Sequence, residues 1–262
     1  GFIIGPIIGG QLGAIDLRLP FWFAAGLALL NFLYGVFVLP ESLPKERRTA
    51  KFDWSHANPV GSMVLLKRYP QVFGLAAVVL IANLAHYVYP SVFVLFAEYQ
   101  YRWNEQQVAW VLAAVGVCSV IVQAGLVGRV VPKFGERRTL LFGLACGVVG
   151  FCIYGMADLG WMFLIGLPIS ALWGLAGPAT QALITQQVGA DVQGRVQGAL
   201  MSLVSLAGIV GPMMFAGTFA LFIGKAAPAH LPGAPWLLAA LLLAIGWLVG
   251  WRFARPPSAA AH

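Results

Sequence analysis

Long apolar runs recur along this chain and constrain its fold more than any other feature. A helix that crosses the hydrocarbon core of a bilayer needs about 20 mostly apolar residues, each adding about 1.5 Å of rise. These runs do not alternate in polarity as the strands of an outer-membrane barrel do. We therefore predict an all-α polytopic membrane protein with about eight transmembrane helices. The sequence predicts a partial span at 1–13 and seven full spans, at 20–39, 71–97, 106–128, 139–157, 161–188, 196–222 and 235–253.

The composition agrees with a membrane protein. Hydrophobic residues make up 60% of the 262 and charged residues only 10%, whereas a soluble domain usually carries roughly 25% charged residues. There is too little charge here to cover the surface of a water-soluble globule.

The basic residues are distributed unevenly over the connections between spans. Most of the 16 Lys and Arg fall in alternate connections, which is the positive-inside pattern. It predicts that the 40–70 loop and the C-terminus face the cytoplasm. The net charge of +7 is therefore read as a topology signal, and not as a nucleic-acid surface, because no aromatics interleave with it. The residues on the predicted cytoplasmic side are Lys45, Arg47, Arg48, Lys51, Lys67, Arg68, Arg129, Lys133, Arg137, Arg138, Arg195, Arg252 and Arg255.

The polar stretch 40–70 divides the spans into two groups. We predict helices at 1–39 that end a first bundle, and a central cytoplasmic loop at 40–70. A complete six-helix bundle at 71–253 and a cytoplasmic tail at 254–262 would follow.

Two stretches combine glycines with a proline inside an apolar span. The span that begins at 196 contains Gly208, Gly211 and Pro212. Glycines let membrane helices approach closely, so these stretches predict either simple kinks or a hinge-like seam between duplicated halves. The N-terminal stretch GFIIGPIIGG supplies Gly1, Gly5, Pro6, Gly9 and Gly10.

GFIIGPIIGG resembles the antiporter signature in the fifth helix of the major facilitator superfamily. Residues 128–138 (GRVVPKFGERR) resemble the cytoplasmic loop motif that this superfamily repeats between its eighth and ninth helices. Residues 191–200 (DVQGRVQGAL) are similar to the connection between the tenth and eleventh helices in the tetracycline efflux branch.

This resemblance implies a secondary transporter of two six-helix halves in the inner membrane, without cofactor or metal. Its partners would be a small drug-like substrate, such as tetracycline, together with protons and the lipid bilayer. Alternating access would then export the substrate by proton-coupled efflux. The resemblance also places residue 1 within the fifth helix, so four further N-terminal helices would be required for a complete transporter.

The matching motif positions have expected roles. Gly128 and Gly135 would supply tight turns, and Arg137 and Arg138 the charge that holds the loop at the inner face. Pro132 stands where the family has an acidic residue. A plain basic turn remains the alternative for this loop. The residues matched in the tenth-to-eleventh connection are Asp191, Gly194, Arg195, Gln197 and Gly198.

Polar residues inside the spans are candidates for substrate binding and coupling. His86 lies well inside a span, and an imidazole pKa of about 6.5 suits proton exchange, although a hydrogen-bonded, non-titrating histidine is the alternative. Asn83 shares its helix face, while Gln123 and Gln181 would line the cavity. The intramembrane His and Asp of the tetracycline branch correspond best to Ser119 and Gly147 here, so we expect any coupling carboxylate in the four missing helices.

The sequence also bears on three other function classes: enzymes, transporters of other metabolites, and non-transporting membrane proteins. An enzyme would need clustered His, Asp or Glu at metal or nucleophile spacing, and no such spacing occurs in the sequence. A transporter of another small metabolite, and a non-transporting receptor or assembly protein on the same fold, stay open because fold does not fix function.

Overall fold

The computed structural model describes residues 4–16, 18–40, 70–224 and 229–254. Every regular element in these ranges is helical. The chain divides into two compact units, residues 1–54 and 55–262. Nearly all of the predicted central loop lies outside the described residues, as does all but the first residue of the predicted tail.

The first unit contains two helices, α1 (Ile4–Ile15) and α2 (Leu19–Phe37). A short turn joins them, in which the Asp16 carboxylate accepts a hydrogen bond from the Arg18 backbone N–H at 2.7 Å. Pro20 stands in the first turn of α2, where its missing N–H breaks no helical hydrogen bond. The antiporter-like glycines and proline therefore sit on α1, except Gly1, which lies outside the described residues.

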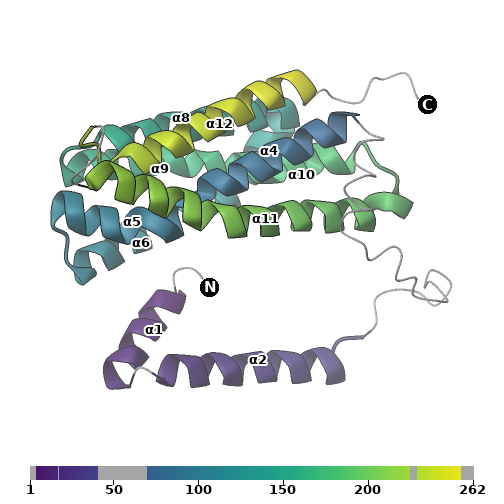
Figure 1. The fold of residues 1–262 in the computed structure, drawn as a ribbon. Helices are drawn as coiled ribbons and strands as arrows, with labels where there is room; N and C mark the ends of the chain where they lie inside the picture. The colour runs from purple at the N-terminus through teal and green to yellow at the C-terminus, as the bar shows by residue number, and fades with distance from the viewer. Residues whose placement is uncertain (1–3, 17, 41–69, 225–228, 255–262) are drawn as a thin grey trace. The chain divides into compact units, whose positions relative to one another are not determined.

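The second unit is a bundle of longer helical runs, several of which change direction or pitch part-way (Figure 1). Its elements are α4 (Pro70–His86), α5 (Val88–Tyr101), α6 (Glu105–Val120), the π-helical turn η3 (Ile121–Leu126), α7 (Val127–Phe134), α8 (Glu136–Met156), α9 (Gly160–Ala171), the 3₁₀ turn η4 (Leu172–Leu175), α10 (Ala176–Thr185), α11 (Ala190–Ile223) and α12 (Ala234–Phe253).

The predicted membrane spans are confirmed. Seven helical runs in the described residues are long and apolar enough to cross a bilayer, and each coincides with one of the seven predicted full spans. The chain is a multi-pass, all-α membrane protein.

Two span boundaries were predicted wrongly, because the helices continue into the polar stretches that were predicted as connections. The run Glu105–Phe134 extends through most of the predicted 129–138 loop, so that Gly135 alone separates α7 from α8. The predicted connection before the next-to-last span is also helical, since α11 begins at Ala190. Long polar side chains such as Arg and Gln keep their heads in water at helix ends, so polarity alone does not end a helix there.

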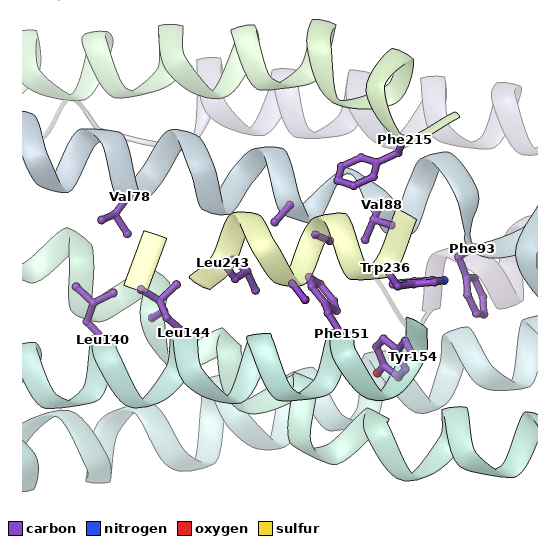
Figure 2. Close-up of a cluster of buried hydrophobic side chains, with 14 of the residues drawn as sticks. Val78, Val88, Phe93, Leu140, Leu144, Phe151, Tyr154, Phe215, Trp236 and Leu243 are labelled. Atoms are coloured by element: carbon purple, nitrogen blue, oxygen red, sulfur yellow. The ribbon is translucent and has the colours of Figure 1, made fainter. Parts of the chain in front are cut away.

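The core of the second unit lies around α12, which packs between α8 and α4. In Figure 2, Leu243 of α12 lies beside Leu144 of α8, and Trp236 of α12 lies beside Tyr154 of α8, with ring centroids 5.1 Å apart. Both α12 side chains are fully buried. Glycines bring α8 close to its neighbours, since a Cβ at Gly150 would lie 2.6 Å from the Ser170 Cβ.

Candidate functional site

The first break in a membrane span lies between α4 and α5. Pro90 has no N–H, so it cannot donate to the carbonyl of His86, and the regular hydrogen-bond ladder is interrupted there. The Tyr87 N–H bonds instead to the Leu84 carbonyl at 3.1 Å in a tighter turn. α4 ends at His86, and α5 begins at Val88.

A second break interrupts the span made by α9 and α10. The 3₁₀ turn η4 lies between them and carries Trp173 and Gly174. Pro178 stands four residues after Gly174, so the Gly174 carbonyl also loses its usual helical donor. A 3₁₀ stretch inside a longer helix often marks a functional hinge.

A third break is the π-helical turn η3 between α6 and α7. It contains Gln123, whose side chain is exposed within the second unit. Single π turns inside α-helices are frequently found at functional sites.

The three breaks lie next to one another. The ring centroids of His86 and Trp173 are 5.9 Å apart. A Cβ at Gly174 would lie 3.5 Å from Val122 Cγ1 and 4.0 Å from Gln123 Cγ. The fold thus brings three helical runs that are far apart in sequence to one height, with His86 beside Trp173 and Gln123 beside Gly174.

A fourth helix, α11, packs closely on Tyr87, the residue between α4 and α5. Cβ atoms at Gly208 and Gly211 of α11 would lie 2.7 Å from the Tyr87 hydroxyl and 2.6 Å from its Cβ. Pro212 follows Gly208 by four residues, so it frees a third carbonyl beside the α4–α5 break.

This arrangement can act as a hydrogen-bonding site inside the membrane. Three carbonyls, at His86, Gly174 and Gly208, have lost their regular donors, and backbone of this kind is tolerated at membrane depth where it is buried in protein or lines a water-filled cavity. His86 and Gln123 add side-chain donors and acceptors, while Trp173 offers an aromatic face. No carboxylate belongs to this group, so it suits an uncharged or cationic, donor-bearing molecule better than an anion.

A hydrogen-bonded cluster of Tyr89, Tyr154 and Ser170 lies next to His86. The Tyr89 ring lies 6.2 Å from the His86 ring, and its hydroxyl donates to Ser170 Oγ at 3.5 Å. The Tyr154 hydroxyl bonds to the same Ser170 oxygen at 2.5 Å. Ser170 in turn donates to the Leu167 carbonyl at 3.1 Å.

The other predicted binding residues lie outside this contact group. Asn83 donates to the Val79 carbonyl of its own helix at 2.8 Å. Ser119 lies one helical turn before Gln123, on α6. Gln181 lies roughly 12 Å further along its helical run than Trp173, given eight intervening steps of 1.5 Å.

The loop motif connects the start of α8 to the C-terminal end of α12. Gly135 has a φ of +79°, a conformation that L-residues with a side chain rarely adopt, so its predicted turn is confirmed. The predicted turn at Gly128 is wrong, because Gly128 lies inside α7. The Arg137 guanidinium donates to the Trp251 carbonyl at 3.1 Å, near the C-terminus of α12, where a helix favours positive charge. Arg138 is exposed.

The residues predicted for the tenth-to-eleventh connection occupy the first turns of α11. Gly194, Arg195 and Gly198 are exposed there, and Gln197 is half-buried. The Asp191 side chain lies outside the described residues.

Sequence reasoning missed the role of Ser170 and Tyr154. Neither belongs to a motif, and each is one polar residue in an apolar span. A partial signal for the site is the set Pro90, Pro178 and Pro212, since each proline frees the carbonyl four residues before it. Pro132 and Pro168 also lie inside helices, so this signal alone does not single out the site. Within the described residues, no three His, Cys, Asp or Glu side chains form a group that could hold a metal ion.

The sequence profile of the Major Facilitator Superfamily matches residues 1–212. The chain belongs to this superfamily. It is 34% identical over 242 residues to the tetracycline resistance protein, class C, of Escherichia coli, covering 92% of this chain and 59% of that protein. It is 34% identical to the class G protein of Vibrio anguillarum, covering 94% and 61%. The chain thus spans about three-fifths of the length of these curated relatives.

A solved structure supports the superfamily fold. The human organic anion transporter MFSD10 superposes with a TM-score of 0.79 over 95% of this chain and 60% of that one, at 19% identity. This likeness concerns the fold alone.

Proposed function

We propose that this chain is part of a secondary transporter of the major facilitator type, which exports a small amphipathic, drug-like compound such as tetracycline. The observation that carries the proposal is the level of broken helices at His86, Trp173 and Gln123. Discontinuous helices near the bilayer midplane build substrate sites in many transporters. The relatives named for tetracycline resistance suggest the direction of transport and the class of substrate.

In this proposal, substrate moves by alternating access and no covalent chemistry occurs on the chain. The 71–253 bundle would be the complete second half, and α1 and α2 the last two helices of the first half. Four more helices at the N-terminal side would complete the transporter, in keeping with the share of the relatives that this chain spans. The 40–70 loop and the C-terminus would face the cytoplasm of an inner membrane, as the basic residues indicate.

Export would be driven by proton exchange. His86 is one candidate for the proton site, since it lies beside Trp173 and is exposed on the face of its helix. No carboxylate accompanies it in the contact group described above, so an acid in the remaining helices would be the second candidate.

The test is an accumulation assay. Bacteria that lack their own efflux pumps would express the full-length parent protein, and tetracycline fluorescence in the cells would be followed before and after an uncoupler is added. We expect lower accumulation that the uncoupler abolishes. Unchanged efflux without a proton gradient would rule out proton coupling, and unchanged accumulation of tetracycline would rule out this substrate.

A site variant localises the substrate contact. Trp173→Ala should weaken export by removing an aromatic face from the broken-helix level, whereas Trp161→Ala should not. Trp161 is an exposed tryptophan near the start of α9 in the same helical run. Equal export by wild type and Trp173→Ala would contradict a substrate site at this level.

A further inference from the structure

A pocket opens where α5 ends and α6 begins. Its volume is about 710 Å³, within the range of about 300–1,000 Å³ common for small-molecule sites. Along the helix, Glu98 lies about 18 Å from the break at His86, given 12 steps of 1.5 Å. The pocket is therefore separate from the transport site proposed above. It is lined by Val94, Glu98, Trp103, Asn104, Glu105, Gln106, Val108, Ala109 and Leu112.

The lining combines an apolar wall with acidic groups. Val94, Val108 and Leu112 supply aliphatic surface, and Trp103 adds an aromatic ring. The only ionisable residues in the lining are Glu98 and Glu105, and both are exposed. The lining therefore presents negative charge beside a hydrophobic surface.

The neighbouring Arg102 does not neutralise these carboxylates. It ends α5 in a left-handed conformation, with φ of +56°, and it does not line the pocket. Within the described residues, no ion pair joins it to Glu98, although that pairing is expected from their spacing. The three side chains together leave a net negative charge at the pocket.

The two carboxylates differ in their helix environment. Glu98 stands in the last turn of α5, where the negative end of the helix dipole adds to its own charge. Glu105 starts α6, where the positive end of the dipole offsets its charge. The α6 N-terminus is already satisfied in part by Asn104 and Gln107, which form a reciprocal capping box. A bound cation would therefore gain most from Glu98.

We propose that this pocket binds an amphipathic organic cation, with its charged group at Glu98 and its apolar body against Val94, Leu112 and the Trp103 ring. The charge of the lining excludes an anion of the same shape. A small inorganic cation would gain nothing from the aliphatic wall. An amphipathic organic cation would bury its apolar body there, and its charge over the Trp103 face would add a cation–π contribution. The site lies outside the transport pathway proposed above, and its occupation does not require transport.

The test compares two probes of equal size and opposite charge. Tetraphenylphosphonium and tetraphenylborate would be titrated into the purified 262-residue chain in nanodiscs, with empty nanodiscs subtracted. We expect saturable binding of the phosphonium and none of the borate. Equal saturable binding of both ions, or none of the phosphonium, would overturn the proposal.

Variants place the binding in the pocket. Glu98→Gln should weaken phosphonium binding by about two- to fivefold, the range that an exposed ion pair contributes, and Glu105→Gln should weaken it less. Glu136→Gln is the matched control, because it removes the same charge just beyond the far end of the run Glu105–Phe134, which is roughly 45 Å long at 1.5 Å per residue. Phosphonium binding that Glu98→Gln leaves unchanged, or that Glu136→Gln weakens as much, would place the cation elsewhere and overturn the proposal.

Because binding is measured without a gradient, this result is independent of the efflux assay. Binding of the cation by the 262-residue chain, together with no tetracycline export by the full-length parent protein, would support the pocket and contradict the proposed function. Export by the full-length protein without cation binding would support the proposed function and contradict the pocket.

Discussion

At the scale of single residues, Ser170 satisfies more polar groups than any motif residue does. Its hydroxyl hydrogen goes to the Leu167 carbonyl, so Tyr154 and Tyr89 must both donate to its oxygen. A hydroxyl has one hydrogen and two lone pairs, and all three are used here. The cluster links α5, α8 and α9 inside the bilayer, where an unsatisfied group cannot turn to water.

Ser170→Ala should therefore destabilise the chain. Two tyrosine hydroxyls would lose their common acceptor, at a cost of about 1–2 kcal/mol for each interhelical bond in a membrane. The change would be measured as a lower Tm in detergent. Ser205→Ala is the matched control, because the exposed Ser205 donates only to the Met201 carbonyl of its own helix. Equal Tm values for the two variants would refute this role of Ser170.

Gly211 and Gly217 test how closely α11 approaches Tyr87. A Cβ at Gly211 would lie 2.6 Å from the Tyr87 Cβ, an atom that cannot swing away, whereas at Gly217 none of the described residues lies within 4 Å of a Cβ. Gly211→Ala should cost about 1–3 kcal/mol through overpacking. Gly217→Ala should gain up to about 1 kcal/mol of helix propensity. Opposite Tm shifts are expected, and shifts of the same sign would contradict the close contact.

At the scale of elements, prolines inside the spans are costly, and three of them lie at the height of the His86–Trp173 contact, whereas Pro132 and Pro168 interrupt helices elsewhere. Proline within a helix costs about 3 kcal/mol or more, and Pro90, Pro178 and Pro212 each free a carbonyl beside the same group of side chains. The coincidence favours a shared function for the freed carbonyls.

Pro178→Ala should restore a donor to the Gly174 carbonyl. We expect the free energy of unfolding to stay unchanged or to rise by up to about 3 kcal/mol, which would be seen as an unchanged or higher Tm. Tetracycline export by the full-length transporter should become slower. Pro235→Ala is the control, because Pro235 stands in the first turn of α12, where a proline breaks no helical hydrogen bond. Wild-type export rates by Pro178→Ala would show that the broken helix is only structural.

At the scale of the whole molecule, the uneven basic residues predict the orientation. Asp158, in the turn between α8 and α9, should face outward, and Glu136, the first residue of α8, should face the cytoplasm. With Cys118, Cys146 and Cys152 changed to Ala, a membrane-impermeant thiol reagent should label Asp158→Cys in intact cells. Glu136→Cys should react only after permeabilisation. The reverse labelling pattern would invert the proposed topology.

The length of the apolar runs was enough to predict the spans, because hydrocarbon thickness sets a helix length that can be counted along the chain. The asymmetry of Lys and Arg could also be counted along the chain, because the predicted orientation depends only on which connections carry the positive charge. Gly135 was predictable as well, because its turn is local. Gly128 was not, because a polar sequence at the membrane surface is compatible with both loop and helix.

Composition and local pattern thus determined that this chain is a bundle of membrane helices, and its motifs placed it in a superfamily. Only the tertiary structure decided which polar groups meet. His86, Trp173 and Gln123 come from three different helical runs, and Ser170 binds two tyrosines from two other helices. These contacts depend on the rotation and close approach of whole helices, which glycines such as Gly150 and Gly211 permit. That approach is set by the packing of many side chains at once, so no single stretch of sequence encodes it.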